Sequence, residues 1–107
     1  MPWLHFTAYF FAGAFLANFV PHFVSGVLGH TFPTPFASPP FRGRSSSPVN
    51  VLYGLGNLAV AYALLLHVGD FDPRHPPYAG VVGLGLAAWS LLIARSLARL
   101  QGGRPER

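Results

Sequence analysis

The most constraining feature of this chain is a long N-terminal stretch without a charged side chain. Arg42 is the first charged residue, and the 41 residues before it contain no Asp, Glu, Lys or Arg. Trp3 to Leu28 is almost continuously apolar and aromatic. A helix in water needs one polar face, whereas this stretch has apolar side chains on nearly every side. We therefore expect lipid to surround it.

Two further segments also lack full charges, residues 45–69 and 75–94. Each is near the roughly 20 residues that a helix needs to cross a bilayer. Only 9% of the chain is charged, against roughly 25% in soluble domains. The sequence predicts an all-α membrane protein, in which residues 1–107 form a single transmembrane domain. Its three predicted spans cover about residues 3–28, 49–69 and 78–97.

The arginines predict the orientation of these spans. Three spans place the N-terminus and the second loop on one side of the membrane, and the first loop and the C-terminus on the other. Arg74 is alone on the first side, and six arginines lie on the second: Arg42, Arg44, Arg95, Arg99, Arg104 and Arg107. The positive-inside rule then predicts an external N-terminus and a cytoplasmic C-terminus. Arginines in these positions meet lipid headgroups, so they do not indicate nucleic acid as a partner.

The two loops differ in character. The first loop, residues 31–48, has four prolines ahead of Pro48 that disfavour helix and favour extended backbone: Pro33, Pro35, Pro39 and Pro40. We expect the three phenylalanines of this loop to rest at the membrane interface or to fill a groove between helices: Phe32, Phe36 and Phe41. Ser47 is predicted to cap the second span, with Pro48 as its first helical residue. The second loop, residues 70–77, is short, which predicts that the second and third spans are antiparallel neighbours.

Each predicted span carries one stripe of small or polar residues at a helical period of about 100° per residue. Such stripes let helices approach closely in a membrane, so we expect the three stripes to face one another. The first stripe is Thr7, Ala14, Asn18, His22, Ser25 and Gly29. The second is Asn50, Gly54, Asn57, Ala61 and Val68. The third is Gly83, Ala87, Ser90 and Ala94.

Four polar side chains on these stripes form a candidate intramembrane site: Asn18, His22, Asn50 and Asn57. Polar groups at membrane depth are costly, so they are usually paired or functional. One interpretation is a polar site for a small solute or a proton. The other is a set of interhelical hydrogen bonds that hold the bundle together. No predicted span contains an acidic residue, which argues against proton-coupled transport.

Two further sets of residues suit a binding site but also have simpler roles. A possible anion or lipid-headgroup site lies at the start of the second span: Arg42, Arg44, Ser45, Ser46 and Ser47. Its simpler role is a topology signal with a helix cap. Potential zinc or copper ligands lie towards the predicted external face: His5, His67, Asp70, Asp72 and His75. Their spacing matches no metal motif, so the sequence predicts no metal, no cofactor and no catalytic residue.

Three runs of the chain, residues 18–29, 32–40 and 45–57, carry a resemblance. They read Asn-Phe-Val-Pro-His-Phe-Val-Ser-Gly-Val-Leu-Gly, Phe-Pro-Thr-Pro-Phe-Ala-Ser-Pro-Pro and Ser-Ser-Ser-Pro-Val-Asn-Val-Leu-Tyr-Gly-Leu-Gly-Asn. Together they resemble a group of small bacterial integral membrane proteins with no assigned activity. The resemblance covers roughly the central third of the chain. It implies a bacterial membrane protein and supplies no catalytic residue.

The predicted function is that of a multi-pass protein of the bacterial inner membrane without enzymatic activity. We expect an accessory or assembly component that packs in the lipid bilayer against itself or a larger membrane complex. The alternative is an oligomeric transporter or channel for a small solute that uses the Asn/His polar site. A third hypothesis is a membrane enzyme or metal-binding protein that uses the external His and Asp residues.

Overall fold

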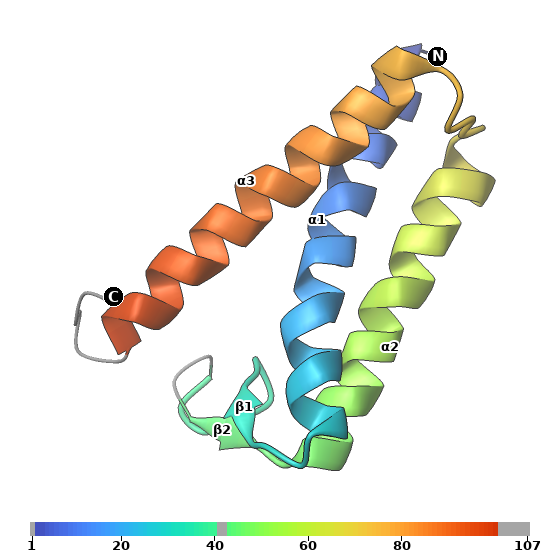
Figure 1. The fold of residues 1–107 in the computed structure, drawn as a ribbon. Coiled ribbons are helices and arrows are strands. Elements are labelled where there is room, and N and C mark those ends of the chain that lie inside the picture. The colour runs from blue at the N-terminus through green and yellow to red at the C-terminus, as the bar shows by residue number, and fades with distance from the viewer. Residues whose placement is uncertain (1, 41–42, 101–107) are drawn as a thin grey trace.

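The chain folds into three long helices with a structured loop between the first two (Figure 1). The computed structural model describes residues 2–40 and 43–100. In chain order the elements are α1 (Pro2–Val27), β1 (Phe32–Pro33), β2 (Arg44–Ser45), α2 (Ser47–Ala63), the π-helical turn η1 (Leu64–Val68) and α3 (Pro76–Leu100).

The length and hydropathy of the helices confirm the predicted class. Within the described residues, three helical segments are long and apolar enough to cross a bilayer: Pro2–Val27, Ser47–Val68 and Pro76–Arg99. The second of these combines α2 with η1. Each segment begins within two residues of the start expected from the sequence, because charged and proline-rich residues bound the apolar runs. The protein is therefore an all-α chain with three candidate membrane-spanning helices.

Helix α1 is the common partner of the other two helices. It packs along both α2 and α3, whereas α2 and α3 have almost no backbone contact with each other in the described chain. Figure 1 shows α3 leaning away from α1 and α2 towards its C-terminal end. The prediction that the second and third spans are neighbours is therefore wrong. A short loop joins two helix ends, but the packing faces determine the angle between the helices.

Glycines fix the contact between α1 and α3. A Cβ atom at Gly85 would overlap the backbone carbonyl of Phe10, and one at Gly13 would overlap the backbone of Val82 and Leu86. The two helix backbones therefore lie closer than any larger side chain would allow at these positions. Close backbone approach at glycine is the usual way that membrane helices gain packing contacts.

This contact corrects the stripe predicted for the third span. Gly85 is buried, but all four residues of the predicted stripe are exposed: Gly83, Ala87, Ser90 and Ala94. Nothing lies within 4 Å of a Cβ atom built at Gly83. Small residues occur on more than one side of α3, and the sequence alone does not say which side meets α1.

The stripe on α2 packs where the sequence predicts. Its four residues Asn50, Gly54, Asn57 and Ala61 are buried, and Val68 is exposed. A Cβ atom at Gly54 would press on the Phe23 backbone of α1. On α1 the prediction is largely wrong: of the predicted stripe only His22 is buried, and Thr7 and Gly29 are exposed. Because this helix has a partner on two sides, its buried residues lie on other faces as well: Ala8, Tyr9, Ala12, Gly13, Ala17, His22 and Gly26.

The loop between α1 and α2 contains a short antiparallel strand pair that the sequence analysis did not predict. Phe32 lies opposite Ser45, and Pro33 lies opposite Arg44. The sequence predicts extended backbone here, but pairing depends on residues 11 and 13 positions apart meeting in space. Phe41 lies outside the described residues.

The start of α2 also differs by one residue from the prediction. Ser46, not Ser47, is the N-cap, and its hydroxyl accepts a hydrogen bond from the backbone N–H of Val49. Pro48 is the second helical residue. The first N–H groups of a helix have no partner within the helix, so proline is tolerated there as well as at the first position.

An aromatic cluster closes the opposite end of the bundle. Tyr9 is fully buried, and its hydroxyl accepts a hydrogen bond of 3.0 Å from the backbone N–H of Asp70. Its ring centroid lies 5.4 Å from that of Phe71 and 5.0 Å from that of Tyr78. Tyr9 thus joins α1 to the second loop and to α3, a role that the sequence analysis did not foresee.

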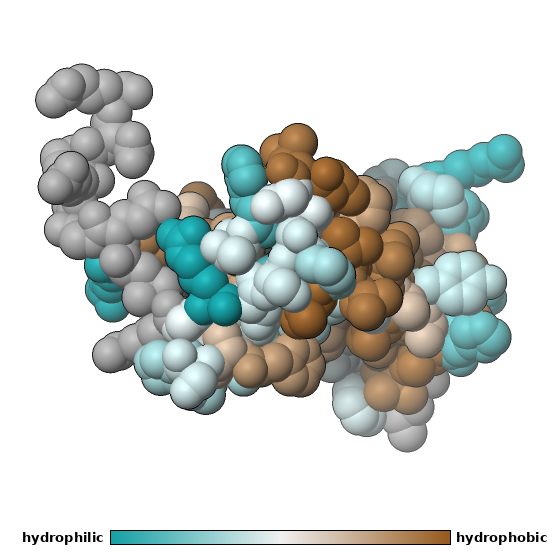
Figure 2. Space-filling model, turned by 90° about the horizontal axis from the view of Figure 1, so that it is seen from below, coloured by the Kyte–Doolittle hydropathy of each residue, from teal (hydrophilic) through white to brown (hydrophobic). Residues whose placement is uncertain are grey.

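Much of the surface is apolar. The exposed fractions of Leu52, Leu84 and Leu91 are 69%, 63% and 72%. Figure 2 looks onto the end of the molecule that carries the loop, and shows hydrophobic residues at the surface beside hydrophilic ones. Apolar surface of this extent is what a bilayer solvates and what soluble monomers avoid.

Candidate functional site: an interhelical groove with a polar floor

A groove lies between α2 and α3 because these helices diverge on either side of α1. One pocket of about 510 Å³ is lined by residues of all three helices, and a second of about 270 Å³ extends towards the loop. The two pockets share four residues: Asn18, Tyr53, Trp89 and Leu92. We call their combined surface the interhelical groove. Asn18 comes from its floor, and Tyr53 and Trp89 come from its two walls.

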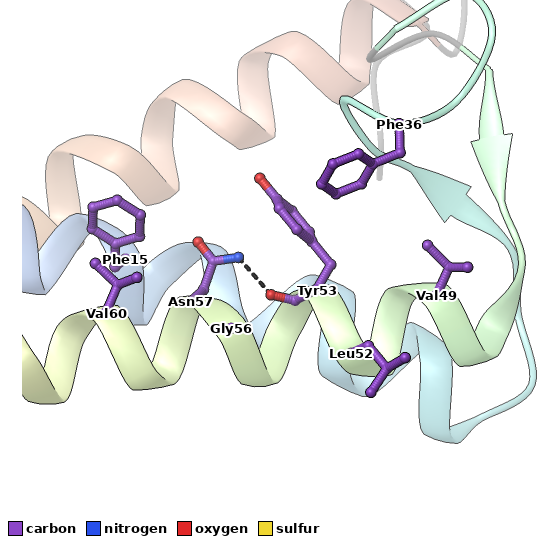
Figure 3. Close-up of a pocket in the computed structure, with 8 residues that line it drawn as sticks. All are labelled: Phe15, Phe36, Val49, Leu52, Tyr53, Gly56, Asn57 and Val60. Carbon is purple, nitrogen blue, oxygen red and sulfur yellow. Dashed lines mark hydrogen bonds between the residues drawn. The ribbon is translucent and has the colours of Figure 1, made fainter.

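Figure 3 shows the α2 side of this region, where a neighbouring pocket of about 480 Å³ lies. The ring of Tyr53 stands between Asn57 and Phe36, and its hydroxyl points away from α2 (Figure 3). The centroids of the Tyr53 and Phe36 rings are 5.4 Å apart, in an edge-to-face arrangement. One phenylalanine of the first loop thus packs on the wall of the groove.

The side-chain amide of Asn18 links all three helices. Its Nδ2 donates a hydrogen bond of 3.0 Å to Oδ1 of Asn57 on α2, and its Oδ1 accepts one of 3.1 Å from the indole Nε1–H of Trp89 on α3. A longer contact of 3.4 Å joins Nδ2 to the hydroxyl of Tyr53. Both ends of one amide are therefore used between helices.

A second pair, His22 and Asn50, joins α1 to α2 and to the loop. Nδ1 of His22 lies 2.8 Å from Oδ1 of Asn50, and both residues are buried. Nδ2 of Asn50 lies 3.1 to 3.2 Å from the backbone carbonyls of Phe32, Ser45 and Ser46. These carbonyls need a donor, which fixes the orientation of the amide. Oδ1 of Asn50 is then the acceptor, so Nδ1 of His22 carries the proton.

The four residues predicted as one polar site are thus divided into two pairs. Asn18 and Asn57 meet near the middle of the bundle, and His22 and Asn50 meet at the loop end. Tyr53 lies between the pairs, with its hydroxyl near Asn18 and its ring centroid 4.6 Å from that of His22. All four side chains are bonded within the protein, as expected of interhelical hydrogen bonds.

Two residues of the groove were missed by the sequence analysis, Tyr53 and Trp89. A signal for Tyr53 was present, because it is three residues after Asn50 and four before Asn57, and so shares their helix face. Trp89 could have been noted because an indole N–H at membrane depth needs an acceptor.

The hydroxyl proton of Tyr53 has no acceptor among the described residues.

The predicted headgroup site at the start of α2 is largely used for internal bonds. The hydroxyl of Ser45 bonds that of Thr34, and the hydroxyl of Ser46 caps α2. Ser47 is half-buried and Arg44 is exposed. Arg42 lies outside the described residues. Two of the three hydroxyls expected to strengthen an anion site, those of Ser45 and Ser46, are therefore engaged. Arg44 is the arginine of this set that the structure describes, and it is exposed.

The external His and Asp residues do not converge. Among residues 2–40 and 43–100, no group of three His, Cys, Asp or Glu side chains is close enough to hold a metal ion. The ring of His75 stacks on Tyr78 with centroids 4.0 Å apart, and Oδ1 of Asp72 accepts a hydrogen bond from the backbone of Arg74. These side chains serve the local structure of the second loop.

Comparison with known proteins finds no relative of this chain. No protein-family model, no curated protein and no solved structure matches the chain.

Proposed function

We propose that this chain is a non-enzymatic accessory or assembly component of a bacterial inner-membrane complex. One observation carries the proposal: the polar side chains inside the bundle are bonded to one another, while α3 offers most of its surface to other molecules. Only 6% of the most apolar stretch of α3 is buried, against 28% for α1. A helix held on one narrow face leaves the rest of its surface for another membrane protein.

The chemistry of the exposed α3 face supports this role. Its small residues allow close approach of another helix: Gly83, Ala87, Ser90 and Ala94. Lipid fits such a face less well than a helix does, because small side chains leave a shallow furrow along it. The partner is a second copy of this chain or another subunit of a larger complex.

The proposed orientation has the N-terminus outside and the loop between α1 and α2 in the cytoplasm. Arg44, Arg95 and Arg99 lie at the loop end of the bundle, and the opposite end carries Asp70, Asp72 and Arg74. This distribution is the one that the positive-inside rule associates with a cytoplasmic loop end. The C-terminus then lies in the cytoplasm as well.

Site-specific photocrosslinking in cells tests the assembly role. A photoreactive phenylalanine analogue at Ala87 should crosslink to one defined protein. The same analogue at Val82, whose backbone lies against Gly13 of α1, should give no intermolecular product. Equal and diffuse products from both positions would refute the proposal. Co-purification of the crosslinked partner should also weaken in the Ala87→Leu variant.

The second candidate is an oligomeric transporter or channel for a small solute. It is favoured by the polar atoms in the interhelical groove, above all the hydroxyl of Tyr53, whose proton has no acceptor in the part of the chain that the structure describes. Purified protein in liposomes would then conduct a solute, and Asn18→Leu would abolish the flux. A stable oligomer is required, because three helices are too few to enclose a solvated path.

A further inference from the structure

The interhelical groove is apolar along most of its length. In its larger pocket the lining side chains are apolar except Asn18, Tyr53, Asn57 and Trp89. This space of about 510 Å³, which no side chain fills, is lined by Leu92 of α3 and by three phenylalanines of α1: Phe10, Phe11 and Phe15. At membrane depth such a space is filled by hydrocarbon, because water has few partners there.

The loop end of the groove lies beside three cations. Pro33 and Ser96 line the smaller pocket. Pro33 is the strand partner of Arg44, and Ser96 lies between Arg95 and Arg99 on the last turns of α3. All three arginines are exposed, and this end carries no carboxylate among the described residues. An anionic group at this end of the groove therefore meets positive charge, and no carboxylate of the described residues competes with it for the arginines.

The opposite end has the reverse character. Asp70 and Asp72 lie there with Arg74 as the one arginine that the structure describes at that end. A second copy of the chain in the same orientation would bring its own three arginines beside those at the loop end. Like charges repel, so charge complementarity favours an anionic occupant over a second copy.

A polar group of the groove also fits such an occupant. Tyr53 is six residues beyond Ser47, or about 9 Å along the helix axis at 1.5 Å per residue. The headgroup layer on each side of a bilayer is roughly 5–8 Å thick. With Ser47 at the outer edge of that layer, Tyr53 lies just beneath it, where the ester carbonyls of a phospholipid supply acceptors for a hydroxyl proton that has none among the described residues.

We propose that the interhelical groove binds one anionic phospholipid. An acyl chain lies between α2 and α3, an ester carbonyl accepts the proton of Tyr53, and the phosphate meets Arg44, Arg95 and Arg99. This site differs from the start of α2, where the hydroxyls of Ser45 and Ser46 are used internally. It is also separate from the outer face of α3, to which the assembly role is assigned.

Trp89 lines the groove and reports directly on its occupant. The chain has two tryptophans, so Trp3→Phe leaves Trp89 as the single fluorophore. The purified full-length protein is placed in nanodiscs that contain brominated phosphatidylglycerol or brominated phosphatidylcholine at equal mole fraction. Bromine quenches tryptophan at short range. We expect the anionic lipid to quench Trp89 roughly twofold more strongly than the neutral lipid.

A matched reference separates a bound lipid from ordinary bilayer contact. Leu91 lies two residues from Trp89 and is 72% exposed, so the variant Trp3→Phe/Trp89→Phe/Leu91→Trp reports on the general bilayer. Both brominated lipids should quench it equally. Equal quenching of Trp89 by the two lipids would overturn the proposal. If neither lipid quenches Trp89, the proposal is also wrong, and a protein helix rather than a lipid occupies the groove.

The arginines are tested without disturbing the bundle. In the Trp3→Phe background, Arg44→Gln/Arg95→Gln/Arg99→Gln should abolish the preference of Trp89 for the anionic lipid. Arg74→Gln, at the opposite end, should leave it unchanged. A preference that survives the triple substitution, or that disappears with Arg74→Gln, would show that the phosphate is not held at the loop end.

Discussion

At the scale of single residues, Asn18 has the widest reach in this bundle. Its amide donates to Asn57 and accepts from Trp89, a residue 71 positions away in the sequence. The amide itself could be found from the sequence, because it stands in a stretch without charges. Its partner on α3 could not, since the helix face that meets α1 depends on backbone packing rather than on local sequence.

Replacing Asn18 with Leu should lower the free energy of unfolding by about 1–3 kcal/mol, because hydrogen bonds between membrane helices contribute about 0.6 to 1.7 kcal/mol each and their partners lose a bond. Reversible unfolding in mixed detergent micelles measures this. Ser90→Leu, on an exposed face of α3, is the control and should change stability by less than about 0.5 kcal/mol. Equal effects of the two substitutions would contradict the role of Asn18.

Asn50 controls the loop rather than the helix contact. Its amide nitrogen holds backbone carbonyls on both strands and at the cap of α2. Asn50→Leu should therefore release the strand pair and speed tryptic cleavage after Arg44 by roughly 10- to 100-fold, given about 1 kcal/mol for each lost bond. Asn57→Leu, which leaves these bonds intact, should cleave at the wild-type rate. A proteolysis time course measures both rates, and equal rates for the two variants would contradict the role of Asn50.

At the scale of elements, two glycines on α3 show what a sequence can and cannot specify. Gly83 and Gly85 both suit close helix packing, and the sequence pattern favoured the face of Gly83. The structure uses Gly85, because that face places α3 against the carbonyl of Phe10. On α2 the choice was easier, since Asn50 and Asn57 mark one face with groups that cannot be left unpaired in lipid.

Substituting alanine for each of the two glycines should change the stability of the protein in opposite directions. Gly85→Ala forces a Cβ against the Phe10 backbone and should destabilise the protein by about 1–3 kcal/mol. Gly83→Ala meets open space and should stabilise its helix by about 0.5–1 kcal/mol, because alanine loses less backbone entropy. Thermal unfolding of the purified variants in one detergent makes the comparison. Destabilisation by Gly83→Ala would place that residue in a contact.

At the scale of the whole molecule, the charge distribution predicts the arrangement across the membrane. Reporter fusions test it: alkaline phosphatase inserted between Asp72 and Pro73 should be active, and a phosphatase fused after Arg107 should be inactive. Green fluorescent protein at the C-terminus should fluoresce. The opposite pattern would invert the proposed orientation, and would also place the arginines on the external face.

Most of the architecture followed from the distribution of charge, because 41 residues without a full charge have few alternatives to a bilayer. The length and class of the helices were therefore predictable. Their order around the bundle was not, because the central position of α1 arises from contacts on two of its faces. The candidate groove was missed for the same reason: it exists only because α2 and α3 diverge.

That central position also bears on how the protein is made. Helix α1 is the first to leave the ribosome and the only one of the three that packs along both others in the described chain. Each later helix therefore finds its partner already inserted when it enters the bilayer, and neither must wait for a segment not yet translated. Co-translational assembly then proceeds by successive docking of α2 and α3 onto one template, so Asn57 and Trp89 meet Asn18 as soon as their helices pack against α1.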